Sequence, residues 1–102
     1  MALAAVCVPP ASAAAEKHCG NMGAAAPDYY DVRARTTTCI AARAVVRSWI
    51  RHGCGVFERC TARTYYTCHG RRSARRIGGT STFLINCRTG ERTVRWWIVP
   101  FD

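Results

Sequence analysis

Hydrophobic residues recur every three to four positions between residues 39 and 52, which is the spacing of one face of an α-helix. The apolar stripe consists of Cys39, Ala42, Val45, Val46, Trp49 and Ile50. The polar side of the same segment carries Arg43, Arg47 and Arg51. Threonines at positions 36–38 offer hydroxyls for an N-cap, and Gly53 is typical of a helix end. The pattern therefore predicts an amphipathic helix.

Alternation of apolar and polar residues, which is typical of a half-buried strand, occurs in three segments. These segments are residues 29–35, 80–87 and 92–99. The last two are separated by a short turn at 88–91 and predict a C-terminal hairpin. Residues 56–57 and 64–67 also have strand composition, whereas residues 69–79 are polar and Gly-rich and predict an exposed loop.

This order of elements predicts an α+β fold in which one amphipathic helix packs on a small antiparallel sheet of three to four strands. We assign residues 29–102 to this single domain, because a chain of 102 residues has room for no more. Residues 16–28 are rich in Gly and Ala without periodicity. We expect them to form an irregular arm that Cys19 tethers to the domain.

Residues 1–15 carry no charge and combine a short apolar run, Pro9-Pro10 and small residues at A-x-A spacing. This composition is typical of the end of a secretory signal peptide, although the basic n-region of a signal is missing. We therefore interpret the segment as a signal remnant whose true start lies upstream. A lipoprotein signal is disfavoured because Val6 precedes Cys7, and a membrane anchor needs about 20 apolar residues. A disordered Ala-rich tail is the remaining alternative.

Seven cysteines support export independently, because removal of Cys7 with the signal leaves an even number. The remaining six are Cys19, Cys39, Cys54, Cys60, Cys68 and Cys87. In a short exported chain this count predicts three disulfides, which stabilise domains too small for a large core. The inner faces of the predicted helix and hairpin favour a Cys39–Cys87 bridge. We expect Cys19 to pair with Cys54 or Cys68.

A metal site is the alternative use of these cysteines and of the three histidines. Zinc sites usually contain close pairs such as C-x2-C, and every interval between successive cysteines beyond Cys7 is longer here. Cys68 and His69 are adjacent, which is poor geometry for two ligands of one ion. We therefore expect disulfides, with no metal and no cofactor.

Charge is the feature most relevant to function, since 15 basic residues face 6 acidic ones and give a net charge of +9. Four cations gather on the predicted loop: Arg71, Arg72, Arg75 and Arg76. With the helical Arg43, Arg47 and Arg51 they predict binding of anionic lipid surfaces, wall components or other anionic polymers. Nucleic acid is disfavoured as the physiological partner of an exported protein. Tyr66 or Trp97 is expected to be exposed for stacking.

Two other functions compete with this hypothesis of a secreted, non-catalytic binding domain. A small ribonuclease would use histidine as general acid or base, with arginine on the phosphate. Its candidates are His52, Glu58 and His69, with Arg59 or Arg63 as clamps. An inhibitor or toxin-like ligand of another exported protein is also compatible with a disulfide scaffold.

Three segments, at residues 31–49, 55–60 and 86–96, resemble a group of small exported bacterial domains common in high-GC actinobacteria. In that group an RARxxxC strand end leads into a helix, and a GFxC segment and a CRxG…VRF hairpin follow. The corresponding stretches here read RARTTTC, GVFERC and CRTGERTVRW. The resemblance covers about two-thirds of the chain and implies a fold rather than a chemistry, because the group lends no catalytic residues. Cys19, Cys54 and Cys68 go beyond its minimal cysteine pattern.

Overall fold

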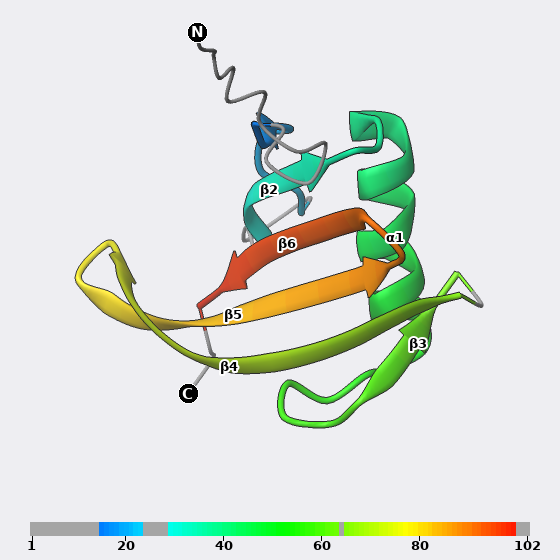
Figure 1. Cartoon of the computed structure of the whole chain (residues 1–102). Coiled ribbons are helices and arrows are strands. Elements are labelled where there is room, and N and C mark those ends of the chain that lie inside the picture. Colours follow the sequence, from blue (N-terminus) through cyan, green and yellow to red (C-terminus); the bar gives the residue numbers. More distant parts are fainter. Residues whose placement is uncertain (1–14, 24–28, 64, 100–102) are drawn as a thin grey trace, which may run out of the picture.

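The computed structural model of the protein describes residues 15–23, 29–63 and 65–99, so the predicted signal lies outside the described residues except for Ala15. The described elements are β1 (Lys17–His18), β2 (Tyr29–Arg35), α1 (Cys39–Arg51), β3 (Cys60–Ala62), β4 (Tyr66–Ile77), β5 (Thr80–Thr89) and β6 (Arg92–Ile98). All strands join one antiparallel sheet in the order β1-β2-β6-β5-β4-β3. Helix α1 covers one face of this sheet (Figure 1).

The predicted α+β class is confirmed, but the expectation of three to four strands is wrong because the described chain forms six. Two of the additional strands, β1 and β3, span only two and three residues, which is too short for alternation to be recognised. Strand β1 lies within the segment expected to be an irregular arm, and it pairs with β2 through Lys17 and His18.

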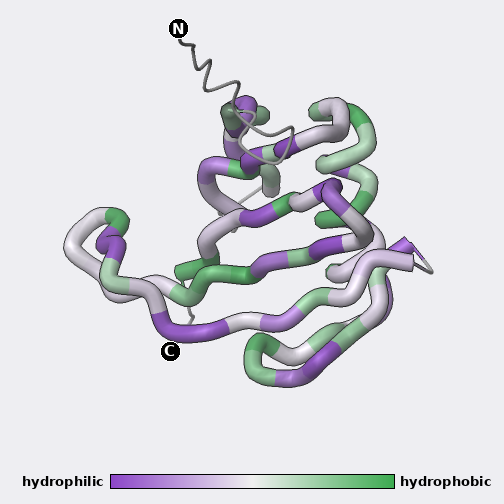
Figure 2. Tube along the Cα trace, viewed as in Figure 1, coloured by the Kyte–Doolittle hydropathy of each residue, from purple (hydrophilic) through white to green (hydrophobic). Residues whose placement is uncertain are grey.

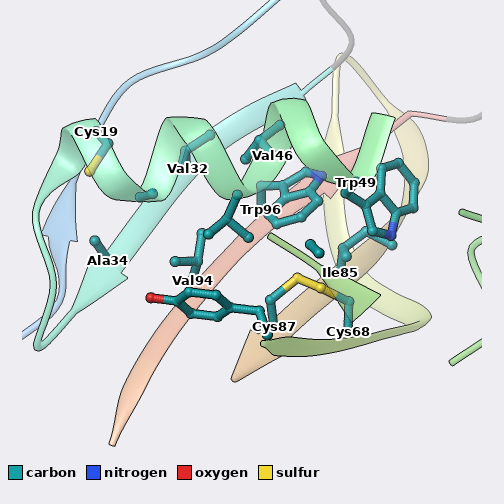
Figure 3. Close-up of a cluster of buried hydrophobic side chains, with 14 residues drawn as sticks. Cys19, Val32, Ala34, Val46, Trp49, Cys68, Ile85, Cys87, Val94 and Trp96 are labelled. Atoms are coloured by element: carbon teal, nitrogen blue, oxygen red, sulfur yellow. A yellow bond between two sulfur atoms is a disulfide. The ribbon is translucent and has the colours of Figure 1, made fainter. Parts of the chain in front are cut away.

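The core lies between α1 and the sheet. Trp49 from the helix meets Trp96 from β6 edge to face, with ring centroids 5.6 Å apart. Val32, Ile85 and Val94 fill the space beside these rings and are fully buried (Figure 3). Val32 comes from β2, whereas Ile85, Val94 and Trp96 come from alternating positions of the paired strands β5 and β6, so the predicted C-terminal hairpin is confirmed.

The helix begins and ends close to its predicted boundaries. The Thr38 hydroxyl accepts a hydrogen bond from the Ala41 amide at 3.1 Å, as expected of an N-cap. Ile50, predicted to lie on the buried stripe, is 40 % exposed. Ser48 is buried instead, because its hydroxyl accepts a hydrogen bond at 2.7 Å from the Arg63 amide in the segment after β3.

The disulfides are Cys19–Cys39, Cys54–Cys60 and Cys68–Cys87. The predicted Cys39–Cys87 bridge is therefore wrong, as are both proposed partners of Cys19. Cys68 and Cys87 lie directly opposite each other on β4 and β5, on the face that α1 covers (Figure 3). Cys39, in the first turn of the helix, joins the segment after β1 instead. Two of the three bridges therefore join separate elements. Cys19–Cys39 connects the start of the helix to the β1 edge of the sheet, and Cys68–Cys87 connects β4 to β5.

The segment at 69–79, predicted to be a loop, instead forms most of strand β4 and a two-residue turn. Gly78 and Gly79 make that turn with φ angles of 59° and 78°, which suit a tight hairpin. Gly70 is needed for another reason, because a Cβ there would lie 2.7 Å from Ile85 Cδ1 and still closer to the backbone of Val56. Figure 1 shows this β4–β5 hairpin extending past the other strands.

Candidate anion-binding face

The sheet face opposite α1, called the open face below, carries most of the charged strand residues. Successive strand side chains alternate between faces. Cys68 and Cys87 face the helix, so His69, Asn86 and Arg88 face the opposite way. By the same rule Arg95 and Trp97 lie on the open face, because Val94 and Trp96 are in the core. Figure 2 shows that hydrophilic segments are spread over several strands rather than gathered in one loop.

Around β6 on this face, three arginines from β2, β4 and β6 surround one tryptophan. The guanidinium carbons of Arg33, Arg75 and Arg95 lie 4.9, 4.5 and 5.3 Å from the centroid of the Trp97 ring. The Trp97 indole N–H donates to the Ser73 hydroxyl at 3.1 Å. Only 6 % of Trp97 is exposed, so these cation–π contacts and the hydrogen bond enclose it. The prediction of Trp97 as an exposed stacking residue is wrong.

Two carboxylates form ion pairs with these three arginines. Asp31 accepts from Arg33 at 2.8 Å and from Arg75 at 2.7 Å, and Glu16 receives both Nε and Nη2 of Arg95 at 2.6 Å. Burial raises the pKa of both carboxyls, but the guanidinium hydrogen bonds outweigh it. The pKa of Glu16 is consequently lowered, and that of Asp31 lies well below its ordinary range. We call Trp97, its three arginines and these two carboxylates the Trp97 cluster.

An irregularity in β2 brings the Asp31 carboxylate to the open face. Tyr30 lies opposite Trp97 and Arg33 lies opposite Arg95, so Asp31 is the extra residue of a bulge. Its φ of 52° is unusual for a residue other than glycine. The Asn21 side-chain carbonyl stabilises this conformation by accepting from the Asp31 amide at 2.8 Å. A local break in pairing thus supplies the acid that the arginines need.

The β3–β4–β5 end of the open face holds a shallow hollow of about 710 Å³, called the Arg59 hollow. Its lining residues are Arg59, Tyr65, Thr67, His69, Asn86, Arg88, Thr89 and Gly90. Arg59 precedes β3, His69 belongs to β4 and Arg88 to β5, so three segments of the chain contribute the basic groups. A second hollow of about 400 Å³ shares Tyr65, Thr89 and Gly90 and adds Thr36, Glu91 and Arg92.

The basic side chains of the Arg59 hollow have no acidic partner among the residues that the structure describes. Arg88 Nε donates to the Gly90 carbonyl at 3.3 Å, and the side chains of Arg59 and His69 make no hydrogen bond and no ion pair within the described chain. All three side chains are exposed. The hollow therefore presents positive charge to solvent without a compensating carboxylate in the described ranges, and can bind an anion without breaking an ion pair there.

The seven arginines expected to bind anions do not form one patch. Arg71 and Arg72 are exposed but point to opposite faces of β4, since they lie opposite Leu84 and Phe83 respectively. Arg75 belongs to the Trp97 cluster, and Arg76 donates to the Gly79 carbonyl at 2.7 Å.

On the helix, Arg43 donates to the Cys19 carbonyl at 3.0 Å and is half-buried. Arg47 and Arg51 are exposed there and make no ion pair within the described ranges.

Sequence reasoning missed three residues that line the hollow. Tyr65 is 51 % exposed, whereas Tyr66, the tyrosine expected to be available for stacking, is only 2 % exposed. Asn86 and Arg88 were not singled out either. The alternation in residues 80–87 could have identified Asn86, because it places the Asn86 side chain on the other face of the sheet from Ile85 and Cys87.

The ribonuclease candidates are divided by the fold. His69 and Arg59 both line the hollow. Glu58 accepts from the Gly55 amide at 3.2 Å, and His52 lies at the C-terminal end of α1 with its Nδ1 3.3 Å from the Ser48 hydroxyl. Arg63 follows β3, and its backbone amide donates to Ser48.

Two further findings concern metals and membranes. Across residues 15–23, 29–63 and 65–99, no three His, Cys, Asp or Glu side chains come together in a group that could hold a metal ion. In the same part of the chain, no helix has the length and hydropathy needed to cross a bilayer.

Comparison of the chain with models of protein families, with curated proteins and with solved structures finds no match.

Proposed function

We propose that this protein is a small secreted, disulfide-stabilised cationic domain that binds anionic polymers or surfaces outside the cell without catalysing a reaction. The observation that carries the proposal is the Arg59 hollow, where Arg59, His69 and Arg88 gather on an exposed face and have no carboxylate partner among the described residues. Uncompensated charge of this kind attracts phosphate, sulfate or carboxylate groups.

Export is supported by the covalent framework and by the N-terminal sequence. Three disulfides persist in oxidising compartments and are rare where thiols are kept reduced. The uncharged, Ala-rich segment at residues 1–15 has the composition of a signal remnant.

The binding surface we propose differs from the loop that the sequence suggested. Arg71 lies on the open face of β4, in the same row of side chains as His69. A polymer lying across β4 and β5 would therefore meet Arg71, His69, Arg88 and Arg59. Arg75 is occupied by Asp31 and Trp97, so it contributes to folding rather than to binding.

Retention on phosphocellulose tests this proposal. The double variant Arg59→Ala/Arg88→Ala should elute at clearly lower salt than the wild type. The matched control is Arg47→Ala/Arg51→Ala, which removes the same charge from exposed positions on α1. It should elute close to the wild type. Equal shifts for both variants would mean that retention follows net charge alone, and would contradict a binding site in the hollow.

A ribonuclease is the second candidate, because the hollow brings His69 and Arg59 together on an exposed face. Incubation of the oxidised protein with single-stranded RNA separates the two functions. The binding proposal predicts that the RNA remains uncleaved. Cleavage that disappears in the His69→Ala variant would replace the proposal with catalysis.

A further inference from the structure

The two adjoining hollows on the open face differ in the chemistry of their linings. The Arg59 hollow contains two guanidiniums, an imidazole and an amide. The second hollow, called the Glu91 hollow, adds the hydroxyl of Thr36, the carboxylate of Glu91 and the guanidinium of Arg92. Tyr65 lies between them and lines both. One end of the combined site is lined by basic groups without a carboxylate and therefore favours an anion. The other end is lined by one charge of each sign, Glu91 and Arg92, and therefore favours a neutral, hydroxyl-bearing group.

Strand register explains how the basic end converges. His69 lies directly opposite Asn86, and Arg88 lies directly opposite Thr67. Opposed side chains in an antiparallel pair have Cβ atoms about 5 Å apart, and diagonal neighbours such as His69 and Arg88 are roughly 7–8 Å apart. Long side chains on such a grid can reach the same small ligand. Arg59 adds a third basic group from the segment before β3.

The donors at this end outnumber the acceptors of a single carboxylate. Each guanidinium offers a fork of N–H groups, and the imidazole, the Asn86 amide and the Thr67 hydroxyl add further donors. A phosphoryl group presents three oxygens around one centre and can use such a set of donors more completely. The chemistry of the Arg59 hollow thus fits a phosphate ester.

The Glu91 hollow determines what is attached to that phosphate. Glu91 is exposed and makes no ion pair within the described ranges, so its carboxylate is available as an acceptor. With Arg92 in the same lining this end has no net charge to attract a second phosphate, whereas the carboxylate accepts hydrogen bonds from hydroxyls. Tyr65, packed at 5.3 Å against the buried Tyr66 ring, presents an aromatic surface beside it. A sugar ring has the hydroxyls and the flat extent that this end can contact.

We infer that the joined hollows form one site for a sugar phosphate unit, with its phosphoryl group between Arg59, His69 and Arg88 and its sugar against Tyr65 and Glu91. This inference rests on the proposed function, because it specifies which unit of an anionic polymer the hollow binds. Nucleic acid and sugar-phosphate polymers share the phosphate and the sugar. The carboxylate and the hydroxyl beside Tyr65 favour contact through the sugar rather than through a base.

Titration of the oxidised protein with three small probes, followed by amide chemical shifts in NMR spectra, tests the inference. The probes are methyl phosphate, ribose 5-phosphate and uridine 5′-monophosphate. Ribose 5-phosphate should bind at least fivefold more tightly than methyl phosphate and about as tightly as the nucleotide. Equal binding of methyl phosphate and ribose 5-phosphate would overturn the role of the sugar. Much tighter binding of the nucleotide would assign the Tyr65 surface to a base and would also contradict the inference.

Variants separate the two ends of the site. Tyr65→Ala and Glu91→Gln should each reduce the affinity for ribose 5-phosphate and leave that for methyl phosphate unchanged. Arg59→Ala/Arg88→Ala should weaken the binding of both ligands, whereas Arg47→Ala/Arg51→Ala should weaken the binding of neither. Suppose that Glu91→Gln and Tyr65→Ala change the affinity for neither ligand, while Arg59→Ala/Arg88→Ala still lowers retention on phosphocellulose. In that case this inference fails and the proposed function stands. If the hollow variant also retains phosphocellulose binding, both fail.

Discussion

The two ends of the open face use the same residue type for opposite purposes. In the Trp97 cluster, arginines enclose an indole ring and are matched by Asp31 and Glu16. In the Arg59 hollow, arginines line a solvent-filled depression and have no carboxylate partner within the described ranges. The comparison teaches that the number of arginines does not locate a binding surface. The positions of the few acidic residues determine which arginines in the described ranges remain without a carboxylate partner.

Replacement of the aromatic residue at each end should give the largest contrast in stability. Trp97→Ala removes an enclosed ring and should lower the free energy of unfolding by roughly 3–5 kcal/mol. Tyr65→Ala removes a ring that is 51 % exposed and should cost about 1 kcal/mol or less. Urea denaturation of the disulfide-intact proteins, followed by far-UV circular dichroism, measures both. Similar losses for the two variants would remove the distinction between the ends.

Neutralising one carboxylate at each end should give a smaller contrast. Asp31→Asn removes the negative charge that Arg33 and Arg75 pair with and one of the two acceptor oxygens, and should lower the free energy of unfolding by about 1–3 kcal/mol. Glu91→Gln, at an exposed position, should change it by no more than about 0.5 kcal/mol. The same denaturation experiment serves for both. An Asp31→Asn protein as stable as the wild type would show that the cluster contributes no stability through this carboxylate.

Acid should destabilise the Trp97 cluster specifically. The pKa values of Asp31 and Glu16 are lowered in the folded protein, so their contribution to stability is complete above their unfolded values, near pH 4. This contribution to stability is lost as the pH falls further, through the lowered pKa values that the two carboxyls have in the folded protein. The wild type should therefore lose stability below about pH 4, and Asp31→Asn/Glu16→Gln should lose less of it. The hollow variant Arg59→Ala/Arg88→Ala should keep the acid sensitivity of the wild type. If this variant were no longer sensitive to acid, the assignment of that sensitivity to the Trp97 cluster would be contradicted.

Replacement of both arginines in the Arg59 hollow by alanine should have the smallest effect on stability. Because Arg59 and Arg88 form no ion pair in the described chain, their joint replacement by alanine should change the free energy of unfolding by less than about 1 kcal/mol. Reduced repulsion between like charges could even stabilise the protein slightly. A loss comparable to that of Trp97→Ala would mean that these arginines hold the fold together.

The sequence predicted the elements that have one buried face. Alternation revealed β2, β5 and β6, and helical spacing revealed α1, because each of these segments packs one side against the core. Strand β4 was mistaken for a loop because, beyond Gly70, its residues are exposed or only partly buried on both faces. Its Arg71-Arg72 pair therefore shows no periodicity. The Cys68–Cys87 bridge was missed for the same reason, since it requires β4 to lie beside β5.

The candidate site was only partly predictable. Arg59 and His69 could be identified as residues capable of phosphate chemistry, but their proximity depends on the pairing of β3, β4 and β5. The role of Arg75 depends on a bulge at Asp31, and no spacing of polar residues indicates that its carboxylate reaches the open face. Charge composition indicated a cationic surface, whereas the fold determines which cations remain uncompensated.

Conversion of the hollow into a second compensated site tests the central claim most directly. Asn86→Asp introduces a carboxylate of nearly the same shape opposite His69. Thr80→Asp is the control, because it adds the same charge at the distal end of β5, roughly 20 Å along the strand. The measurement is the dissociation constant for fluorescently labelled polyphosphate, read by anisotropy at fixed salt. We predict roughly tenfold weaker binding for Asn86→Asp, because a unit charge about 5 Å from the ligand costs on the order of 1–3 kcal/mol. Thr80→Asp should bind nearly as tightly as the wild type, and equal weakening by both variants would contradict the account.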